Sequence, residues 1–378
     1  MWGQELQDPD EKAKAGLQLA DGFGACLLLL IGDLDHVAKE LGLEHSGSLR
    51  PCTQCRCNKS TIPWTETHAT QAKFWATVYK TAADWRRHHP RPTCVLWELV
   101  GITGLSFFPD WMHTKHLGCD QYTLGSVLSY LFHEVLEDDA PANLQWLWAC
   151  IRQQYQAPWR THSHRSSMLR CARHMRRHAP AATRAPRRCQ ALKTPTRLNR
   201  LTENMIENKK GPFPSLKSKA AESRNLGQAV LNVFVDHMDE DSQVHRVIKA
   251  TLEASVALED MITEHMDLRK YPLPVATEFL QLCSDYDQRV TWLCNHFHPQ
   301  EMRYFNYTFK FHQLLHCGYM ARYLNPARTW CYQGEDLMQR VKKVVASSTR
   351  GVAKHMWCDR ALQKYTRGWS FQVANTIA

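Results

Sequence analysis

Two cysteines near the start of the chain, Cys52 and Cys55, have the spacing of a metal-binding knuckle. In a C-x-x-C turn, two thiolates can reach one zinc ion. Zinc in a structural site takes four ligands, and the sequence contains no second C-x-x-C. A zinc site at this pair therefore needs two further ligands from a distant part of the chain.

A candidate for the missing half is the histidine pair His312 and His316 in KFHQLLHC. The apolar spacing of this stretch predicts a helix, and residues four apart leave a helix on the same face. Together the two pairs form a complete Cys2His2 ligand set for tetrahedral zinc. The alternative is chance, because the chain has 20 histidines. Cys57 and Cys317 are further thiols that could enter the site.

Acidic side chains form a second group of candidates. Asp33 follows GACLLLLIG, a short apolar run that predicts a buried strand. Two-metal nucleases place carboxylates at strand ends, because Mg²⁺ prefers oxygen ligands and phosphoryl transfer needs charge neutralised on both reacting oxygens. The alternative is a helix cap, since Asp33 also stands directly before the helical stretch LDHVAKEL.

Two more candidate motifs lie further along the chain. Asp110 and His113 form a D-x-x-H in PDWMH, and Glu335 stands at the entry of the amphipathic stretch EDLMQRVKK. An acid in the first turn also favours the helix dipole, so Glu335 has a structural explanation beside the metal-binding one. Taken singly these residues are ordinary, and their order along the chain is what makes them informative.

The elements that must position these residues are mostly helices. Apolar residues at i, i+3 and i+4 predict helices within 121–136, 143–156, 220–238, 244–266, 274–297, 305–324, 335–351 and 361–371. Helical spacing also occurs at 36–43 and 72–89, whereas 93–102 fits either a buried strand or a short buried helix. The pattern predicts a mixed α/β protein that is strongly α-rich.

The net charge of +10 is concentrated in one segment. Residues 160–200 contain eleven Arg, one Lys and no acid, which leaves about −2 for the rest of the chain. The enclosing segment 158–200 is rich in Arg, His and Pro without an apolar period, so we expect it to be disordered. It fits a surface insertion or a translated non-coding stretch better than a basic DNA-contacting arm.

The composition limits the class of protein. Apolar residues make up 44% and charged residues 22%, as in globular proteins, and 14 cysteines are too sparse for a disulfide scaffold. We see no signal peptide, and the longest apolar run, ACLLLLI, is too short to span a bilayer. We therefore expect a nuclear or cytoplasmic protein that is neither secreted nor membrane-bound. No P-loop, dinucleotide fingerprint or G-x-S-x-G occurs.

Taken in order, the motifs resemble those of the DDE/D transposases of the CACTA–Mirage–Chapaev group, a layout that the recombination-activating recombinase of vertebrate immunity shares. The order is a strand-end Asp, a C-x-x-C, a D-x-x-H, a histidine pair and a Glu. Asp33 and Cys52 are 19 residues apart, as are His316 and Glu335. The local sequences at these places also resemble those of the family: they are GDLDHVAKELGL, PDWMHTKHLG and NPARTWCYQGEDLMQRVKK. The resemblance covers roughly 17–351, without 158–195.

The resemblance implies a partial RNase H-like core with a large helical insertion domain. It implies that the cysteine pair and the histidine pair hold a structural Zn²⁺ that pins the insertion to the core. In the family, two aspartates and the glutamate bind two Mg²⁺ or Mn²⁺, which activate water and then a DNA 3′-hydroxyl. Asp33 matches the second of those aspartates and Glu335 the glutamate. DNA is then the expected partner, and a homodimer is one expected assembly.

Five segments follow from this layout. They are a partial core segment (1–60), the start of the helical insertion (61–157), the disordered segment (158–200), the rest of the insertion (201–330), and C-terminal helices that carry the acidic residue of the core (331–378). Only 32 residues precede Asp33, too few for the strands that carry the family's first aspartate.

We therefore expect a transposon-derived, N-terminally truncated transposase-like protein that is inactive by itself. One alternative is a domesticated, zinc-stabilised helical module that binds DNA or protein without catalysis. A second is a helical scaffold without a metal.

Overall fold

The protein is mostly helical, with one small parallel sheet. The computed structural model describes residues 30–65, 73–89, 94–98, 102–155, 196–207 and 211–377. Its strands are β1 (Leu30–Gly32) and β2 (Phe107–Pro109). Its α-helices are α2 (Leu34–Lys39), α3 (Ala82–His88), α4 (Asp120–Tyr130), α5 (Ala140–Gln154), α6 (Glu203–Ile206), α7 (Ala220–His237), α8 (Gln243–Glu264), α9 (Leu273–Phe297), α10 (Phe309–Met320), α11 (Tyr332–Thr349) and α12 (Trp357–Ile377).

Shorter helical segments connect these elements. Turns of 3-10 helix lie at Lys73–Thr77, Val95–Glu98, Gly104–Ser106, His298–Gln300, Pro326–Arg328 and Lys354–Met356. Segments of π-helix, Met112–Cys119 and Leu131–Val135, adjoin the two ends of α4. Within the described ranges, no helix combines the length and the apolar composition that crossing a membrane requires.

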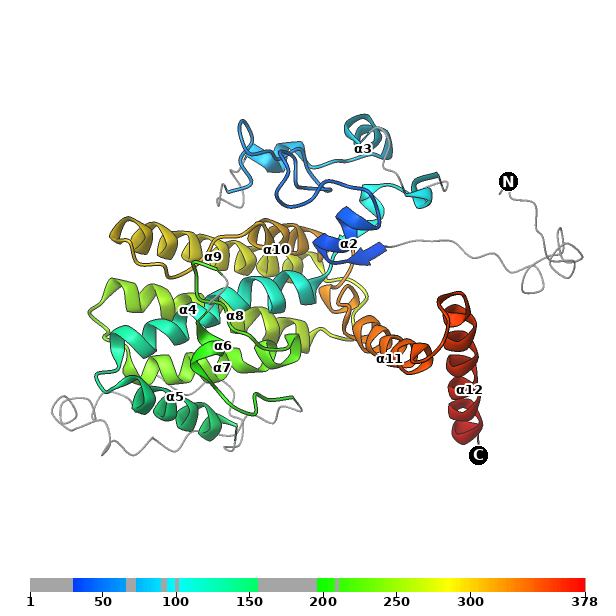
Figure 1. Cartoon of the computed structure of the whole chain (residues 1–378). Helices are drawn as coiled ribbons and strands as arrows, with labels where there is room; N and C mark the ends of the chain where they lie inside the picture. The colour runs from blue at the N-terminus through cyan, green and yellow to red at the C-terminus, as the bar shows by residue number, and fades with distance from the viewer. Residues whose placement is uncertain are drawn as a thin grey trace, which may run out of the picture.

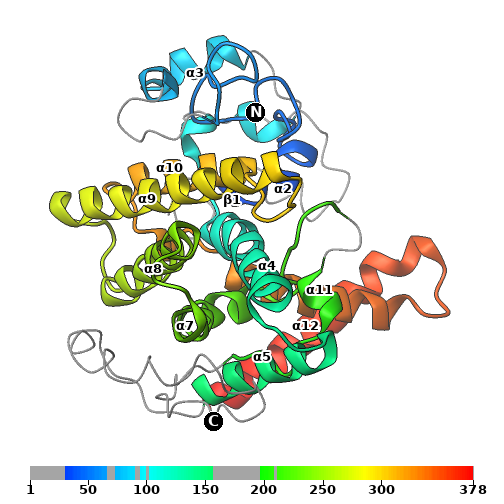
Figure 2. The same ribbon diagram turned by 90° about the vertical axis from the view of Figure 1, so that its left-hand side faces the viewer.

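The helical body is built from α4 and α7 to α10, with α5 on its outer side (Figures 1 and 2). In α9 the buried positions Phe279, Cys283, Tyr286, Val290 and Leu293 recur every three or four residues, so one continuous apolar stripe faces the interior. This stripe packs between α8 and α10, the helices that flank α9. The amphipathic spacing in the sequence therefore predicted the body correctly.

A second, smaller layer lies over α9 and α10 (Figure 1). It is formed by the chain between β1 and α3 and has its own apolar cluster, whose members include Val37, Leu41, Tyr79, Trp85 and Phe107. β1, at the start of this layer, pairs in parallel with β2, and β2 packs against α10 of the body. The layer therefore connects to the body at two places, the sheet and the cysteine loop described below.

Three sequence predictions differ from the structure or lie partly outside it. The described part of 93–102 forms a 3-10 turn, which is closer to the short-helix alternative than to the strand, and 72–89 is divided into a 3-10 turn and α3. Most of the segment predicted to be disordered (158–200) lies outside the described residues, but 196–200 is described and Leu198 is buried in the main core. This end of the segment thus belongs to the folded body.

The last two long helices leave the body. α11 and α12 pack against each other and project away from the other helices (Figures 1 and 2). The reversal between them begins at Gly351, whose φ of 70° is the left-handed conformation that favours glycine after a helix. The two helices form a hairpin that is attached at the start of α11.

Candidate metal centre and carboxylate edge

The cysteine loop, residues 52–57, is held in place by backbone contacts. The N–H of Gln54 donates to Cys52 Sγ (3.3 Å), and its carbonyl accepts from the N–H of Tyr79 (2.9 Å). Cys55 forms an antiparallel bridge with Val78. These contacts hold the two cysteines in position beside the chain around Val78 and Tyr79.

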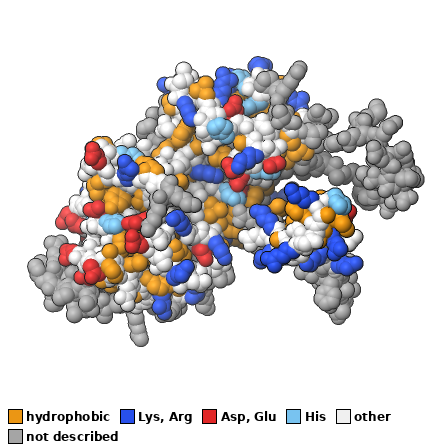
Figure 3. Space-filling model, in the orientation of Figure 1, with side chains coloured by type: hydrophobic (Ala, Val, Ile, Leu, Met, Phe, Trp, Pro, Cys, Tyr) orange, Lys and Arg blue, Asp and Glu red, His pale blue; other side chains and the backbone are white. Residues whose placement is uncertain are grey.

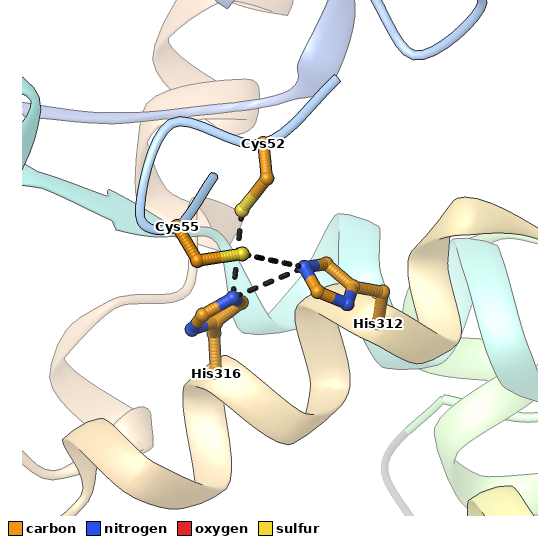
Figure 4. Close-up of side chains that lie close together, drawn as sticks. All are labelled: Cys52, Cys55, His312 and His316. Atoms are coloured by element: carbon orange, nitrogen blue, oxygen red, sulfur yellow. Dashed lines mark hydrogen bonds between the residues drawn. The ribbon is translucent and has the colours of Figure 1, made fainter. Parts of the chain in front are cut away.

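The two histidines leave one face of α10, as their spacing predicts, and both are buried. Phe74 meets His312 edge-on with ring centroids 4.5 Å apart, and Trp75 meets His316 in the same way at 5.6 Å. Both aromatic side chains come from the 3-10 turn that follows the cysteine loop. Figure 4 shows the two imidazole rings turned toward the cysteine sulfurs.

The four predicted ligands converge on one point. Cys52 Sγ lies 3.4 Å from His316 Nε2, and Cys55 Sγ lies 3.5 Å from His312 Nε2. The two Nε2 atoms are 3.1 Å apart, and all four ligand atoms lie within 4.8 Å of one another. The sequence prediction that these two distant pairs meet is therefore confirmed.

The spacing of these atoms fits a tetrahedral metal ion. With Zn–S bonds of about 2.3 Å and Zn–N bonds of about 2.05 Å, a regular tetrahedron puts sulfur about 3.6 Å from nitrogen. The same geometry puts two nitrogens about 3.3 Å apart. The observed S···N distances of 3.4 and 3.5 Å and the N···N distance of 3.1 Å are close to these values. The cluster could therefore hold a metal ion such as zinc.

The electrostatics of the cluster also suit a metal. Burial disfavours ionisation of the Cys52 thiol, yet hydrogen bonds from Cys55 and Cys57 and the adjacent imidazoles hold its pKa well below the usual value. Burial lowers the pKa of His312 and so keeps its imidazole neutral, whereas burial and the neighbouring thiols raise the pKa of Cys55, so that its thiolate would need the positive charge of a bound metal ion. A thiolate and a neutral imidazole are the forms that coordinate zinc.

The two additional thiols differ in position. Cys57 is buried, and its Sγ lies 3.5 Å from His312 Nε2, so it adjoins the cluster. Cys317 instead faces the carbonyl of Pro109, with its Sγ 3.9 Å from that oxygen. Of the two thiols that the sequence left open, only Cys57 is placed beside the metal ligands.

A second group of predicted residues meets at one edge of the small sheet. Asp33 directly follows β1 and Asp110 directly follows β2, and the parallel register places Gly32 opposite Pro109. Both carboxylates therefore emerge at the same edge. His113 joins them, because its Nε2 lies 3.9 Å from Asp33 Oδ2 and its Nδ1 is hydrogen-bonded to Asp110 Oδ2. We call Asp33, Asp110 and His113 the carboxylate edge.

The two carboxylates have different surroundings. The Asp33 side chain is 36% exposed, and its Oδ1 accepts from the N–H of His36, so it also caps α2 as the alternative interpretation expected. Asp110 is fully buried. Its Oδ1 accepts two backbone N–H groups, one of them from Cys331, and its Oδ2 bonds to His113. Asp33 is thus accessible to solvent, whereas both carboxylate oxygens of Asp110 are engaged in hydrogen bonds within the protein.

The start of α11 adjoins this edge. The Cys331 N–H donates to Asp110 Oδ1 (3.0 Å), and the Tyr332 hydroxyl lies 2.7 Å from His116 Nδ1. Glu335 is in the first turn of α11, about 6 Å of helical rise beyond Cys331. Its side chain lies outside the described residues, so its predicted place beside Asp33 stays a prediction.

Sequence reasoning missed two features of the edge. It did not predict β2, although Phe107–Pro109 followed by Asp110 repeats the pattern of an apolar run ending in an acid seen at Asp33. It also missed Lys310 on α10. Burial lowers the pKa of Lys310, against the opposing effect of Asp33 and other nearby acidic groups. Nothing in the local sequence around Lys310 signals this position.

A buried polar network lies beyond the edge and was also not predicted. His116 Nε2 lies 2.8 Å from Glu259 Oε1, and Asp120 completes the group. Lys115 Nζ lies 2.7 Å from Asp120 Oδ2 and 3.4 Å from Glu259 Oε1. Because a buried cation already neutralises these carboxylates, the network is better suited to joining helices than to holding a metal ion.

Comparisons of the chain with protein-family models, with curated proteins and with solved structures found no match.

Proposed function

We propose that the protein is transposon-derived and of the DDE/D transposase type, a DNA-binding protein whose helical body is fastened by zinc to a strand pair bearing carboxylates. The observation that carries the proposal is the carboxylate edge: Asp33 and Asp110 follow two paired parallel strands and share His113. The order of motifs in the sequence supports the same type of protein.

Zinc has a structural role in this proposal. The cysteine loop belongs to the small layer and the histidines to α10 in the body, so one ion at Cys52, Cys55, His312 and His316 would join the two. That junction lies close to the sheet, because α10 also packs against β2. Loss of the ion would free the cysteine loop from α10.

The carboxylates determine what chemistry to expect. A divalent ion at the edge would neutralise charge on a DNA phosphate and activate a water molecule. Among the described side chains at this edge, Asp33 has an exposed oxygen, whereas the oxygens of Asp110 already accept hydrogen bonds. A two-metal site needs at least one carboxylate that bridges both ions. We therefore propose that the chain by itself binds DNA and cleaves it very slowly or not at all.

The alternative function is a domesticated, zinc-stabilised module that binds DNA or protein without any catalysis. The full use of Asp110 within the protein favours this alternative, since a carboxylate that supports α11 and His113 is not free to bind a metal ion. In this case Asp33 would act only as the cap of α2.

Incubation of the zinc-loaded chain with supercoiled plasmid and Mg²⁺ or Mn²⁺ tests the proposal. We expect tight DNA binding and at most trace nicking, and any nicking should disappear in Asp33→Ala and Glu335→Ala. Rapid nicking would contradict the expected lack of activity, and an absence of DNA binding would contradict the proposed type of protein. DNA binding together with trace nicking that neither substitution removes would mean that the nicking does not come from the carboxylates of the chain, and would favour the alternative.

A further inference from the structure

The projecting hairpin of α11 and α12 is strongly basic. Over α11 and α12 it carries eight Lys or Arg residues against three acids, and all eight cations lie between residues 337 and 367, where Asp359 is the one acid. All eight are exposed: Arg340, Lys342, Lys343, Arg350, Lys354, Arg360, Lys364 and Arg367. Figure 3 shows Lys and Arg side chains gathered on the part of the molecule that projects from the body. The charge is therefore on a surface that solvent and a partner can reach.

This charge is not a general property of the protein. The whole chain carries +10, of which residues 160–200 contribute +12 and residues 337–367 contribute +7, so the remainder carries −9. Outside residues 160–200, the hairpin is a basic element on an otherwise acidic chain, which favours the attraction of a polyanion to this surface. Among described side chains, none of the eight cations forms an ion pair that would neutralise it.

The cations of α12 form a stripe. Arg360, Lys364 and Arg367 stand at i, i+4 and i+7, so they lie on one face of the helix within about 10 Å of axial rise. Charges spaced in this way can contact successive phosphates along one strand of a duplex. The arrangement suits a regular line of negative charges better than a single anion.

We infer that the α11–α12 hairpin binds the phosphate backbone of duplex DNA. The choice of DNA as the polyanion rests on the proposed function, whereas the surface itself is identified by its charge and exposure. Half-exposed apolar side chains such as Leu337, Met338 and Leu362 also lie on the hairpin. Apolar contact with a second copy of the chain would not require eight cations, so the charge decides in favour of the nucleic acid.

The position of the hairpin links it to the carboxylate edge. α11 starts beside Asp110 through the Cys331 N–H, and Arg340, the first cation, is about 14 Å of helical rise further along. DNA held along α11 would therefore lead toward the exposed carboxylate of Asp33. In this arrangement the hairpin supplies sequence-independent affinity for DNA, and the carboxylate edge lies next to the DNA that the hairpin holds.

Fluorescence anisotropy with a labelled 30-bp duplex and the zinc-loaded full chain, without added Mg²⁺, tests the inference over a range of salt concentrations. Each phosphate contact contributes about 0.9 to the slope of log affinity against log salt. The triple variant Arg360→Gln, Lys364→Gln, Arg367→Gln should lower the magnitude of that slope by about 2.7 and weaken binding at least tenfold at 0.1 M salt.

Two control proteins make the result specific. Arg269→Gln, Lys270→Gln, Arg303→Gln removes three exposed charges from the body and should leave the slope near that of the unmodified chain. Arg360→Lys, Lys364→Arg, Arg367→Lys keeps the charge and should keep the slope, which separates loss of charge from misfolding. Thermal melting of each variant checks the fold.

The inference is overturned if the hairpin variant binds DNA as the unmodified chain does, or if the body variant loses as much slope. It is also overturned if hairpin-dependent binding is found only with vesicles of anionic lipid. Since no divalent ion is added, the outcome is independent of cleavage. Hairpin-dependent binding leaves the inference standing whatever the plasmid assay shows, whereas DNA binding that does not depend on the hairpin overturns the inference while the proposed function stands.

Discussion

Cys52 and His316 are separated by 264 positions in the sequence, yet Cys52 Sγ lies 3.4 Å from His316 Nε2. One of these residues belongs to the small layer and the other to α10, so their contact joins two parts of the fold. Without a metal ion, these four buried ligand atoms have mainly one another as hydrogen-bond partners. A bound zinc ion would turn this contact into a firm junction.

The first prediction concerns that junction. Cys52→Ser and His316→Asn should each abolish stoichiometric zinc, because three remaining ligands hold the ion far more weakly. Atomic absorption of the purified protein measures the zinc content. Hydrogen exchange should then accelerate in residues 50–80 while α8 and α9 keep their protection, since those helices pack in the main core. Equal zinc content in variant and unmodified protein would rule out this ligand set.

The second prediction separates Cys55 from Cys57, whose sulfurs are both 3.5 Å from His312 Nε2. Cys55→Ser should abolish zinc binding. Cys57→Ser should retain one zinc per chain with about 10- to 100-fold lower affinity, as expected for a residue that supports the ligands without binding the ion. Competition with a chromogenic chelator measures both affinities. The opposite ranking would make Cys57 the ligand and Cys55 its support.

Local sequence rules predicted the helical body well. The recurrence of apolar residues in α9 and the histidine spacing in α10 both follow from 3.6 residues per turn, and the structure keeps them. The ligand pairs could be predicted from their types and spacing, because a C-x-x-C pair and an i, i+4 histidine pair together supply the four ligands of a zinc site. The helical faces and the spacing within each ligand pair are therefore set by residues within one or two helical turns of one another.

The features that were missed depend on distant contacts. β2 is only three residues long and exists because it pairs with β1, whose sequence is 77 positions away, so no periodicity marks it. Glu259 lies in α8 at a position that reads as a surface acid, and only tertiary packing brings it to His116 and Lys115. Sequence patterns show which face a helix buries but not which partner covers that face.

The third prediction concerns the buried network. Burial raises the pKa of Glu259, but His116, Lys115 and Arg224 outweigh this effect and hold the pKa far below its usual value. Glu259→Gln leaves those cations without their shared partner and should cost about 3–5 kcal/mol of unfolding free energy. Urea unfolding followed by circular dichroism measures the change.

A control for this substitution lies on the same helix. Glu253 pairs with Lys249 at 3.5 Å, and both side chains are exposed, so Glu253→Gln should cost less than about 1 kcal/mol. Similar losses for the two variants would mean that the buried network contributes no more than a surface ion pair.

Tyr332→Phe should lose about 1 kcal/mol of unfolding free energy, because it removes the hydrogen bond between Tyr332 and His116.

The last prediction concerns Asp287, a carboxyl group buried in α9. Burial raises its pKa to about 8, although the hydroxyl of Tyr307, which donates to Oδ1 at 2.7 Å, acts in the opposite direction. In the unfolded chain the pKa is close to 3.8. Between these two values the folded state keeps a proton that the unfolded state releases. Stability should therefore fall as the pH rises from about 4 to about 8, by up to about 1.4 kcal/mol per pH unit from this group.

Two substitutions isolate this effect in melting experiments at pH 5, 7 and 9. Asp287→Asn removes the titrating group while keeping its shape, so it should flatten the fall between pH 5 and 9 and be more stable than the unmodified protein at pH 9. Tyr307→Phe removes the hydrogen bond that favours the ionised form, so the fall should continue to higher pH. If Asp287→Asn follows the pH profile of the unmodified chain, the carboxyl is ionised in the folded protein at neutral pH and its burial is compensated by a cation that approaches the unpaired Oδ2.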